Sequence, residues 1–532
     1  MRKNLIAGFL GVALLLPTAG FAQAPAVKIT PAEKKAAEAV TAKQLSDYLY
    51  FVASDEMEGR DTPSRGLDTV AKFIGMNLDK WGFKPAGDDG SFYQKISLVR
   101  DVPDAANSKL EIAGRSFVAG TDFVRGAGSG SVSGSLVFGG SGWSVKAKGM
   151  DPLAGVDAKG KIVVFTSAGG GRNAMPAGLT RADLTGQRGV DWADPMTNAE
   201  RAGAVAVIMI GGATLNQNTG GRGPGYAMEK LRPAASMPVI NITTTVADAI
   251  FAGESGDRNG TAGFALSKSA NANIAVKRET ASTQNVVALW EGSDPTLKSE
   301  MVAIGAHYDH VGVNLNAPGP DKIWNGADDD GSGTVAVLSI AEALAKAPTR
   351  PKRSVLFVWH CGEEKGLWGS EYFNKFPTVD IKKVIAQLNI DMIGRSRAAG
   401  NTEPKDKDLT DGNTIYVIGK DMMSSTLGAI VDGANKGYLN MNYDTRYDDP
   451  KDTNRFFFRS DHFNYAVNGI PIAFWFDGVH VDYHGPADTA DKIDYPRMEK
   501  ITRTIFLTLW ELTDLKERPK IDKQLPPELS AR

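Results

Sequence analysis

Two adjacent glutamates, Glu363 and Glu364, follow an apolar run that reads SVLFVWH at residues 354–360. Like charges this close together disfavour ionisation of both, so the pair needs a compensating cation or an open face to water. Adjacent residues near the end of a strand project in different directions. One glutamate can therefore bind a cation, while the other takes a proton from water.

Other side chains that bind metals also follow apolar runs. At the ends of four such runs stand His307 with Asp309, Glu363 with Glu364, Asp391, and His484. A turn that reads NGADDDGSG adds three acids, Asp328 to Asp330, between the first two of these runs. In open α/β sheets, sites form outside the carboxyl ends of the strands, so we expect these side chains to meet.

The mixture of imidazole and carboxylate groups favours zinc and related divalent ions over calcium. The charges balance with two ions, because three carboxylate ligands and a shared hydroxide neutralise them. Two ions about 3.5–4 Å apart can bind a water and a substrate carbonyl oxygen together. Taken alone, an aspartate here is better explained as a helix cap, and a histidine as a hydrogen-bonded structural residue. The joint arrangement is what predicts a metal site.

The elements that position these residues alternate between strands and helices from Gln284 onward. Strands are expected at 285–291, 301–307, 354–360, 384–390, 414–419 and 471–476, with helices at 333–347 and 497–515. Near-continuous apolar strands that alternate with helices predict an α/β fold with a mostly parallel mixed sheet, sandwiched by helices.

The rest of the chain divides into segments that differ in composition and in secondary-structure pattern. Helices are expected between Thr30 and about Phe83, whereas residues 131–270 combine Gly-rich turns with short β signals. These Gly-rich loops lack the Gly-Lys-Ser/Thr ending of a phosphate-binding loop. The predicted organisation is a signal peptide at 1–24, the N-terminal part of the main domain at 25–130, a β-rich insertion at 131–270, the main part at 271–520, and an exposed tail at 521–532.

Composition narrows the functional classes. Arg2 and Lys3 precede a short apolar run and then small residues, a pattern typical of a signal peptide, so we expect a periplasmic or extracellular protein. No later run is long enough to predict a membrane span. The 60 basic and 62 acidic side chains leave no basic excess for nucleic acid. Cys361 is the only cysteine, so no internal disulfide forms.

The motifs GAHYDH, NGADDDGSG, CGEEKGLWGS, LNIDMIG and DYHGPADT together resemble the co-catalytic di-zinc exopeptidases that include bacterial leucyl aminopeptidases. Glutamate carboxypeptidases and the transferrin receptor ectodomain are more distant relatives. The resemblance covers about 285–515 in detail, and ASDEMEGRDTPSRG is similar to the segment with which such catalytic domains begin. Residues 131–270 resemble an inserted protease-associated domain.

The resemblance implies a role for each residue. Two Zn²⁺ ions are expected per chain, with the metal ligands His307, Asp329, Glu364, Asp391 and His484. Within this set His307 and Asp391 hold one ion, Glu364 and His484 hold the other, and Asp329 bridges them. Asp328 or Asp330 is the alternative bridge, because relatives often have Asn-Asp-Asp here. Glu363 is expected to be the general base, Asp309 to orient His307, and Tyr483 to donate to the oxyanion.

The function implied is a zinc-dependent aminopeptidase that removes N-terminal residues from peptides with a free amino end, through a water activated by zinc. A carboxypeptidase or dipeptidase of the same family is the alternative, kept open by Arg455 and Arg459. A glutaminyl cyclase-like acyltransferase or a non-catalytic binding relative would lack a ligand, and none of the ligand types is missing. The oligomeric state, the native metal and the side-chain preference stay open.

Overall fold

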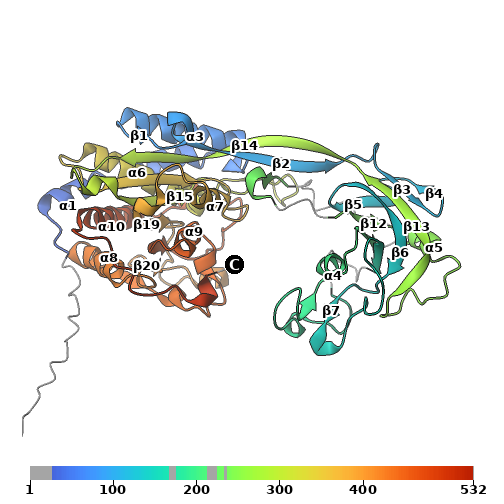
Figure 1. The fold of residues 1–532 in the computed structure, drawn as a ribbon. Coiled ribbons are helices and arrows are strands. Elements are labelled where there is room, and N and C mark those ends of the chain that lie inside the picture. The colour runs from blue at the N-terminus through green and yellow to red at the C-terminus, as the bar shows by residue number, and fades with distance from the viewer. Residues whose placement is uncertain (1–26, 167–174, 212–224, 233–236, 531–532) are drawn as a thin grey trace, which may run out of the picture. The chain divides into compact units, whose positions relative to one another are not determined.

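The computed structural model describes residues 27–166, 175–211, 225–232 and 237–530. The predicted signal peptide lies outside the described residues. The chain divides into two compact units, Met1–Lys95 with Thr283–Arg532, called here the α/β unit, and Ile96–Ser282, called the β-rich unit. The chain leaves the first unit within strand β2 (Tyr93–Pro103) and returns to it within strand β14 (Val276–Trp290) (Figure 1).

The α/β unit is built on a mixed sheet, which is the predicted fold class. Its strands are β1 (Lys84–Pro85), β14 (Val276–Trp290), β15 (Met301–His307), β18 (Ser354–His360), β19 (Val384–Ile390), β20 (Thr414–Ile418), β21 (Asn442–Asp444) and β22 (Ile472–Phe476). The order is β14-β18-β15-β19-β22-β20-β21. The four central strands β18, β15, β19 and β22 run parallel, and β14 and β20 flank them antiparallel.

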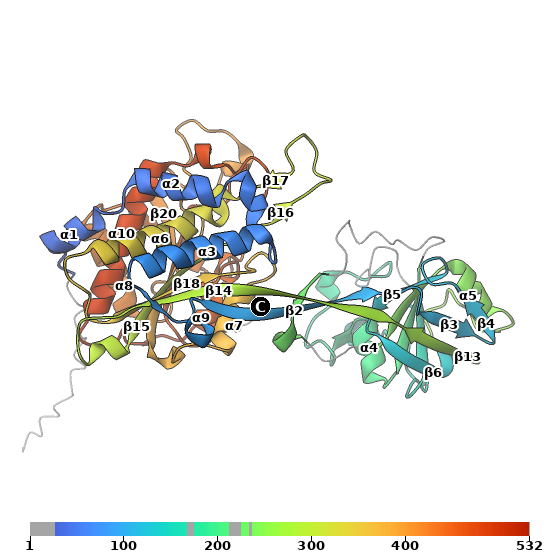
Figure 2. The same ribbon diagram turned by 90° about the horizontal axis from the view of Figure 1, so that it is seen from above.

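Helices pack on both sides of this sheet (Figures 1 and 2). They are α1 (Pro31–Ala37), α2 (Ala42–Val52), α3 (Arg65–Lys80), α6 (Gly333–Lys346), α7 (Trp368–Lys375), α8 (Ser425–Gly437), α9 (His462–Val467) and α10 (Tyr495–Asp514). Every residue of β15, β18 and β19 is buried, which explains their continuous apolar sequences. None of the helices in the described ranges is long and apolar enough to cross a bilayer.

The N-terminal helices begin at side chains that cap them. Thr30 accepts the backbone N–H of Glu33, and Glu33 returns a bond to the Thr30 N–H, which completes a capping box at α1. Thr41 and Ser64 cap α2 and α3 by accepting the backbone N–H groups of Gln44 and Leu67, without the reciprocal bond. Helices α1, α2 and α3 lie where the sequence predicted helical structure.

The β-rich unit holds an eight-stranded sheet of order β4-β3-β13-β6-β8-β10-β12-β5. Its elements include β2 (Tyr93–Pro103), β3 (Lys109–Ile112), β4 (Arg115–Phe117), β5 (Phe123–Ala127), β6 (Gly130–Phe138), β7 (Ser144–Val145), β8 (Ile162–Thr166), β9 (Trp192–Ala193), α4 (Pro195–Arg201), β10 (Ala206–Ile210), β11 (Ala227–Met228), β12 (Val239–Ile242), α5 (Thr244–Phe251) and β13 (Phe264–Ile274). This unit is wider than the predicted insertion at 131–270, because β3, β4 and β5 join its sheet.

Two short strands complete the α/β unit beside the site. They are β16 (Gly312–Val313) and β17 (Ile323–Trp324), which pair antiparallel. This hairpin connects β15 to the acidic turn NGADDDGSG, which ends where α6 begins. The connection returns the acidic turn to the carboxyl end of β15, beside the ends of β18 and β19.

Candidate metal centre

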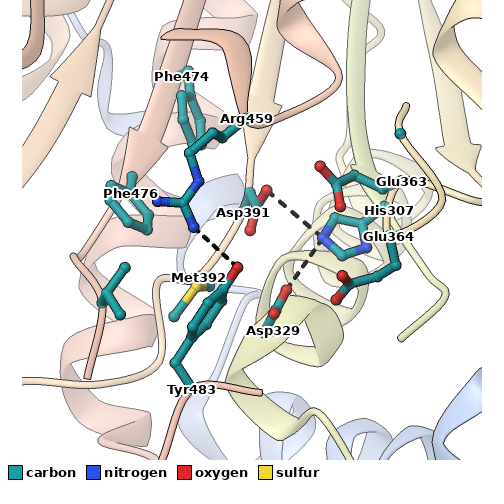
Figure 3. Close-up of a pocket in the computed structure, with 12 residues that line it drawn as sticks. His307, Asp329, Glu363, Glu364, Asp391, Met392, Arg459, Phe474, Phe476 and Tyr483 are labelled. Atoms are coloured by element: carbon teal, nitrogen blue, oxygen red, sulfur yellow. Dashed lines mark hydrogen bonds and ion pairs between the residues drawn. The ribbon is translucent and has the colours of Figure 1, made fainter. Parts of the chain in front are cut away.

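The site lies at the carboxyl ends of the central strands, around a cavity of about 210 Å³. The cavity is lined by six of the residues singled out from the sequence, namely His307, Asp329, Glu363, Glu364, Asp391 and Tyr483 (Figure 3). His484 is in contact with two of them. Met392, Phe474, Phe476 and Val479 supply an apolar wall.

One group of ligand atoms surrounds His307, the last residue of β15. Its Nε2 lies 3.3 Å from Asp329 Oδ1 and 3.6 Å from Asp391 Oδ2. Asp391 directly follows β19, which is the parallel neighbour of β15, so the two side chains emerge at the same sheet edge. An imidazole nitrogen with two carboxylate oxygens this close fits a divalent cation.

A second group surrounds His484. Its Nε2 lies 3.0 Å from Asp329 Oδ2 and 3.0 Å from Glu364 Oε1. Asp329 therefore presents Oδ1 to His307 and Oδ2 to His484, and its carboxylate lies between the two groups. This is the position that a bridging ligand needs.

The neighbours of Asp329 are occupied elsewhere. Asp330 accepts the backbone N–H groups of His307, Gly333 and Met392, and so ties together the end of β15, the start of α6 and the end of β19. Asp328 accepts the N–H of Gly394, 2.7 Å away. Of the three acids in the turn, Asp329 is the one that lines the cavity.

Two buried residues that the sequence reasoning did not single out hold this turn in place. Asp488 accepts the backbone N–H groups of Asp328 and Asp329, at 3.0–3.1 Å. His480 Nε2 lies 3.3 Å from Asp328 Oδ2. Both residues belong to the segment that carries His484, so the acidic turn and that histidine are positioned together.

Asp309 connects a predicted ligand to the predicted base. Its Oδ1 lies 3.6 Å from His307 Nδ1, and its backbone oxygen lies 3.2 Å from the same nitrogen. The same Oδ1 accepts the backbone N–H of Glu363 at 3.1 Å. The geometry fits a residue that fixes the His307 ring so that Nε2 faces the cavity.

Arg60 is the third residue that sequence reasoning passed over, although it stands in the quoted segment ASDEMEGRDTPSRG. Its side chain is fully buried and donates to the carbonyl oxygens of Tyr308, Asn325 and Gly326, and also of Val52. The Tyr308 carbonyl belongs to the loop that follows His307, and those of Asn325 and Gly326 belong to the turn that contains Asp329. A guanidinium satisfied by backbone carbonyls therefore holds the two loops at a fixed separation.

Tyr483 and Arg459 lie together on the wall of the cavity. Arg459 Nη2 donates to the Tyr483 hydroxyl at 3.1 Å, and the Tyr483 ring stacks on His484 with centroids 4.0 Å apart (Figure 3). Burial raises the pKa of Tyr483, and the carboxylates of Asp329 and Glu364 raise it further. The phenol therefore keeps its proton, which is free to be donated.

The acids of the cavity differ in their pKa shifts, depending on which charged groups lie near them. Burial raises the pKa of Glu363, and Glu364 and Asp391 add to the rise. Burial also raises the pKa of Asp391, with a contribution from Asp329. Burial opposes ionisation of Glu364 as well, but His310 and His484 outweigh it and lower its pKa. Among these three acids, only Glu364 has its ionised form favoured by its neighbours.

The histidines respond in the opposite direction. Burial by itself lowers the pKa of His484, but Asp329 and Glu364 outweigh this effect and raise it to about 10. Burial likewise opposes protonation of His307, but Asp391, Asp309 and Asp329 raise its pKa well above the usual value. Without a metal, protons supply the positive charge that these carboxylates require.

The donor set fits divalent cations on structural grounds. The nitrogen and oxygen atoms of His310, Asp329, Glu364 and His484 lie within 4.8 Å of one another, and so do those of His307, Asp330 and Asp391. Asp329 Oδ2 and Asp309 Oδ2 are buried and make no hydrogen bond within the described residues. Buried oxygens without donors, beside imidazole nitrogens, are what a cation site leaves when protein atoms alone are considered.

His310 was not among the predicted ligands, although the quoted motif GAHYDH contains it. It follows the end of β15 by three residues, where strand alternation no longer says which way a side chain points. The structure places its ring beside Glu364 and Asp329.

Comparison with known proteins identifies the segment that carries this site. Residues 285–509 match the model of peptidase family M28, so the resemblance predicted from the motifs is confirmed for this segment. A probable leucine aminopeptidase of Trichophyton verrucosum is 28% identical over 227 residues, which cover 41% of this chain and 56% of that protein. Leucine aminopeptidase 2 of Arthroderma otae is 27% identical over 280 residues, covering 47% and 50%. The chain spans about half the length of these relatives.

Among solved structures, an aminopeptidase from Aneurinibacillus sp. strain AM-1 is similar over 93% of this chain and 97% of its own, at 19% identity and a TM-score of 0.49. The zinc aminopeptidase BSAP from Bacillus subtilis is similar over 91% and 98%, at 19% identity and a TM-score of 0.46.

Proposed function

We propose that this chain, whose residues 285–509 match peptidase family M28, is a zinc-dependent aminopeptidase that hydrolyses the N-terminal residue from peptides. The observation that carries the proposal is the placement of Asp329, with one oxygen toward His307 and the other toward His484. A carboxylate shared by two ligand groups is the centre of a site for two ions. The names of the related leucine aminopeptidases support the same reaction.

In this proposal His307 and Asp391 hold one Zn²⁺, Glu364 and His484 hold the other, and Asp329 holds both. When bound, zinc supplies a Lewis acid that polarises the scissile carbonyl and lowers the pKa of water. Asp309 keeps the Nδ1 side of His307 occupied, so that Nε2 stays directed to the ion.

Glu363 is the proposed general base. The rise in its pKa makes the carboxylate a stronger base toward the proton of the attacking water. Its carboxylate takes a proton from the attacking water and later delivers one to the leaving amine. Glu363 and Glu364 come from one loop and lie on either side of the His307 ring in the view of Figure 3.

Tyr483 is the proposed oxyanion donor. Its hydroxyl accepts a hydrogen bond from Arg459, which leaves its own proton for the substrate oxygen. The apolar wall of Met392, Phe474, Phe476 and Val479 offers room for an apolar N-terminal side chain.

The remaining features of the proposal rest on the sequence. The pattern at residues 1–24 supports export to the periplasm or outside the cell. The β-rich unit is proposed to be a protease-associated domain, on the resemblance of residues 131–270. The partner is a peptide with a free amino end, and the charge balance supports no nucleic-acid partner.

A matched pair of peptides tests the proposal. One peptide has a free amino terminus and a leucine in first position, and the other is the same peptide with an acetylated terminus. The free peptide alone should be cleaved, cleavage should stop on chelation, and zinc should restore it. Elemental analysis should give two zinc per chain. Equal cleavage of both peptides would refute the aminopeptidase assignment. Cleavage that continues after complete metal removal would refute the dependence on zinc.

A carboxypeptidase or dipeptidase is the second candidate, and Arg459 favours it. The guanidinium lines the cavity and has no carboxylate partner within the described part of the chain, so it can receive the terminal carboxylate of a short substrate. Peptides with an amidated carboxyl terminus distinguish the candidates. An aminopeptidase cleaves them as well as the free acids, whereas a carboxypeptidase or dipeptidase loses most of its kcat/KM, as does Arg459→Gln on the free acids.

A further inference from the structure

His310 is a buried histidine that is held rigidly beside the proposed site. Its backbone N–H donates to the Arg60 carbonyl at 3.2 Å. Its ring packs against Gly326 so closely that a Cβ on that glycine would lie 2.4 Å from His310 Cγ. The ring also meets the His484 ring edge to face, with centroids 5.5 Å apart. The imidazole therefore has a fixed position.

The ring of His310 faces the same two oxygens that His484 faces. Its Nδ1 lies 3.1 Å from Glu364 Oε1 and 3.7 Å from Asp329 Oδ2, while His484 Nε2 lies 3.0 Å from each. Two imidazole nitrogens and two carboxylate oxygens thus converge on one volume.

Neither ring nitrogen of His310 makes a hydrogen bond within the described residues, although the ring is fully buried. A buried polar atom without a hydrogen-bond partner costs free energy. His310 Nδ1 lies near oxygens of Glu364 and Asp329, but neither contact is aligned as a hydrogen bond, so the nitrogen is left unsatisfied. A cation between the four atoms would satisfy Nδ1. The lone pair of this nitrogen would bind the cation directly, and no N–H group would have to point at either carboxylate oxygen.

We propose that His310 binds, through Nδ1, the ion held by Asp329, Glu364 and His484. This inference rests on the proposed two-ion function and goes beyond it. That ion then has two imidazoles, whereas the ion at His307 and Asp391 has one. Because nitrogen ligands favour zinc, the ion at His310 is the one that the chain retains longer during metal removal.

The first test measures metal content. The wild-type chain, His310→Ala and His360→Ala are dialysed against the same series of zinc buffers and then analysed for zinc. His360 is a matched control, since it is also fully buried, but its ring nitrogens face Tyr465 and Asp461. His310→Ala should bind one of its two ions at least about tenfold more weakly, because even an outer partner of a ligand is worth 10–100-fold. His360→Ala should match wild type.

Two outcomes separate this inference from the proposed function. If the wild-type chain binds no zinc, the proposed function is refuted. A wild-type chain and His310→Ala that both bind two zinc with equal affinity leave the function standing and overturn the inference, and His310 then only positions Glu364.

The second test is spectroscopic and does not depend on the alanine variant folding well. In His310→Cys the sulfur takes the place of Cγ, one bond short of Nδ1, and metal–sulfur bonds, which are about 0.2–0.3 Å longer than metal–nitrogen bonds, recover part of this difference in reach. The variant loaded with two cobalt ions should show a thiolate-to-cobalt charge-transfer band in the near ultraviolet. The wild-type chain, whose Cys361 is buried away from the cavity lining, should lack it. Two bound cobalt ions without this band overturn the inference.

Discussion

Buried carboxylates are treated differently in the two units of the chain. In the β-rich unit, Asp101 is almost fully buried and receives the guanidinium groups of Arg232 and Arg278. Hydrogen bonds from Arg232 lower its pKa. In the α/β unit, Glu363 and Asp391 face other acids, and burial raises their pKa values. The first carboxylate is neutralised by guanidinium groups of the chain, whereas the second cluster calls for added positive charge, from protons on its histidines or from a bound cation.

The largest expected effect comes from Glu363→Gln. If Glu363 is the base and not a ligand, the variant should keep two zinc and lose about 10²–10⁴-fold in kcat, the usual size of general acid–base catalysis. Steady-state kinetics with elemental analysis on the same sample measures both quantities.

The matched variant is Glu364→Gln, which should lose zinc as well as activity. If Glu363→Gln loses zinc and Glu364→Gln keeps it, the roles of the two glutamates are exchanged.

Removing the metal should cost the next largest amount. A ligand present at 100–1,000 times its Kd stabilises the folded state by about 2.7–4.1 kcal/mol, so chelation should lower the melting temperature clearly. The variant Asp391→Asn removes one carboxylate from the cluster. It should melt at a higher temperature than wild type when both are free of metal, and at a lower one when both are offered zinc. Calorimetry of the four samples checks the reversal.

The metal-free chain should also depend on pH in a defined direction. The pKa of His484 is raised to about 10, above its usual 6.5, so its protonation stabilises the folded state fully below pH 6.5. This stability is lost as the pH rises towards 10. Urea unfolding of the metal-free chain should show the decline between these limits, and the zinc-loaded chain should not. A flat profile without metal contradicts the account of the cluster.

A smaller effect is expected where the carboxylate has its own cation. Asp101→Asn should destabilise the chain by about 1–2 kcal/mol, less than a fully buried pair is worth, because Arg232 and Arg278 are 31% and 58% exposed. Zinc content should not change. Denaturant unfolding and elemental analysis measure the two effects, and a loss of zinc in this variant would contradict the separation between the two kinds of carboxylate.

The fold of the α/β unit could be predicted because its strands are buried on both faces. Strand β15 and its parallel neighbours are apolar at nearly every position, so composition alone marks them. Strand β13 reads FALSKSANANI, and in it more exposed residues largely alternate with buried ones. Such a strand has a weak apolar signal, and the sequence reasoning did not identify it.

The candidate site could be predicted only as far as strand ends reach. Types and positions identified His307, Asp391 and the glutamate pair, because His307 ends a strand and the others follow a strand by one to four residues. The position of Asp329 within the acidic run depends on the backbone N–H groups that Asp488 accepts, and Asp488 is distant in sequence. His310 lies in a loop positioned by Arg60. The positions of side chains in loops depend on contacts with residues distant in sequence, which a local sequence pattern does not predict.

The smallest expected effect comes from a carboxylate outside the site, and it tests whether a shielded carboxylate without a cation costs stability once it ionises. Glu511 lies on α10, partly buried, and burial with the nearby Glu33 and Asp514 raises its pKa to about 7, with Lys352 opposing. Because this value is above the usual 4.5, the folded state favours the protonated acid, and that stability is lost as the pH rises from about 4.5 through 7. After a discount for its half-exposed position, Glu511→Gln should gain about 1 kcal/mol at pH 8.

Most of this gain should disappear at pH 5, where the folded chain keeps Glu511 protonated. Urea unfolding of Glu511→Gln and of Glu517→Gln at both pH values measures it, with the second variant as an exposed control near the same helix. An equal gain at pH 5 and pH 8 would mean that the glutamine stabilises the helix by another route. A gain confined to pH 8 would extend the rule from the cluster to a single residue: a carboxylate shielded from water, with no cation of its own, costs stability once it ionises.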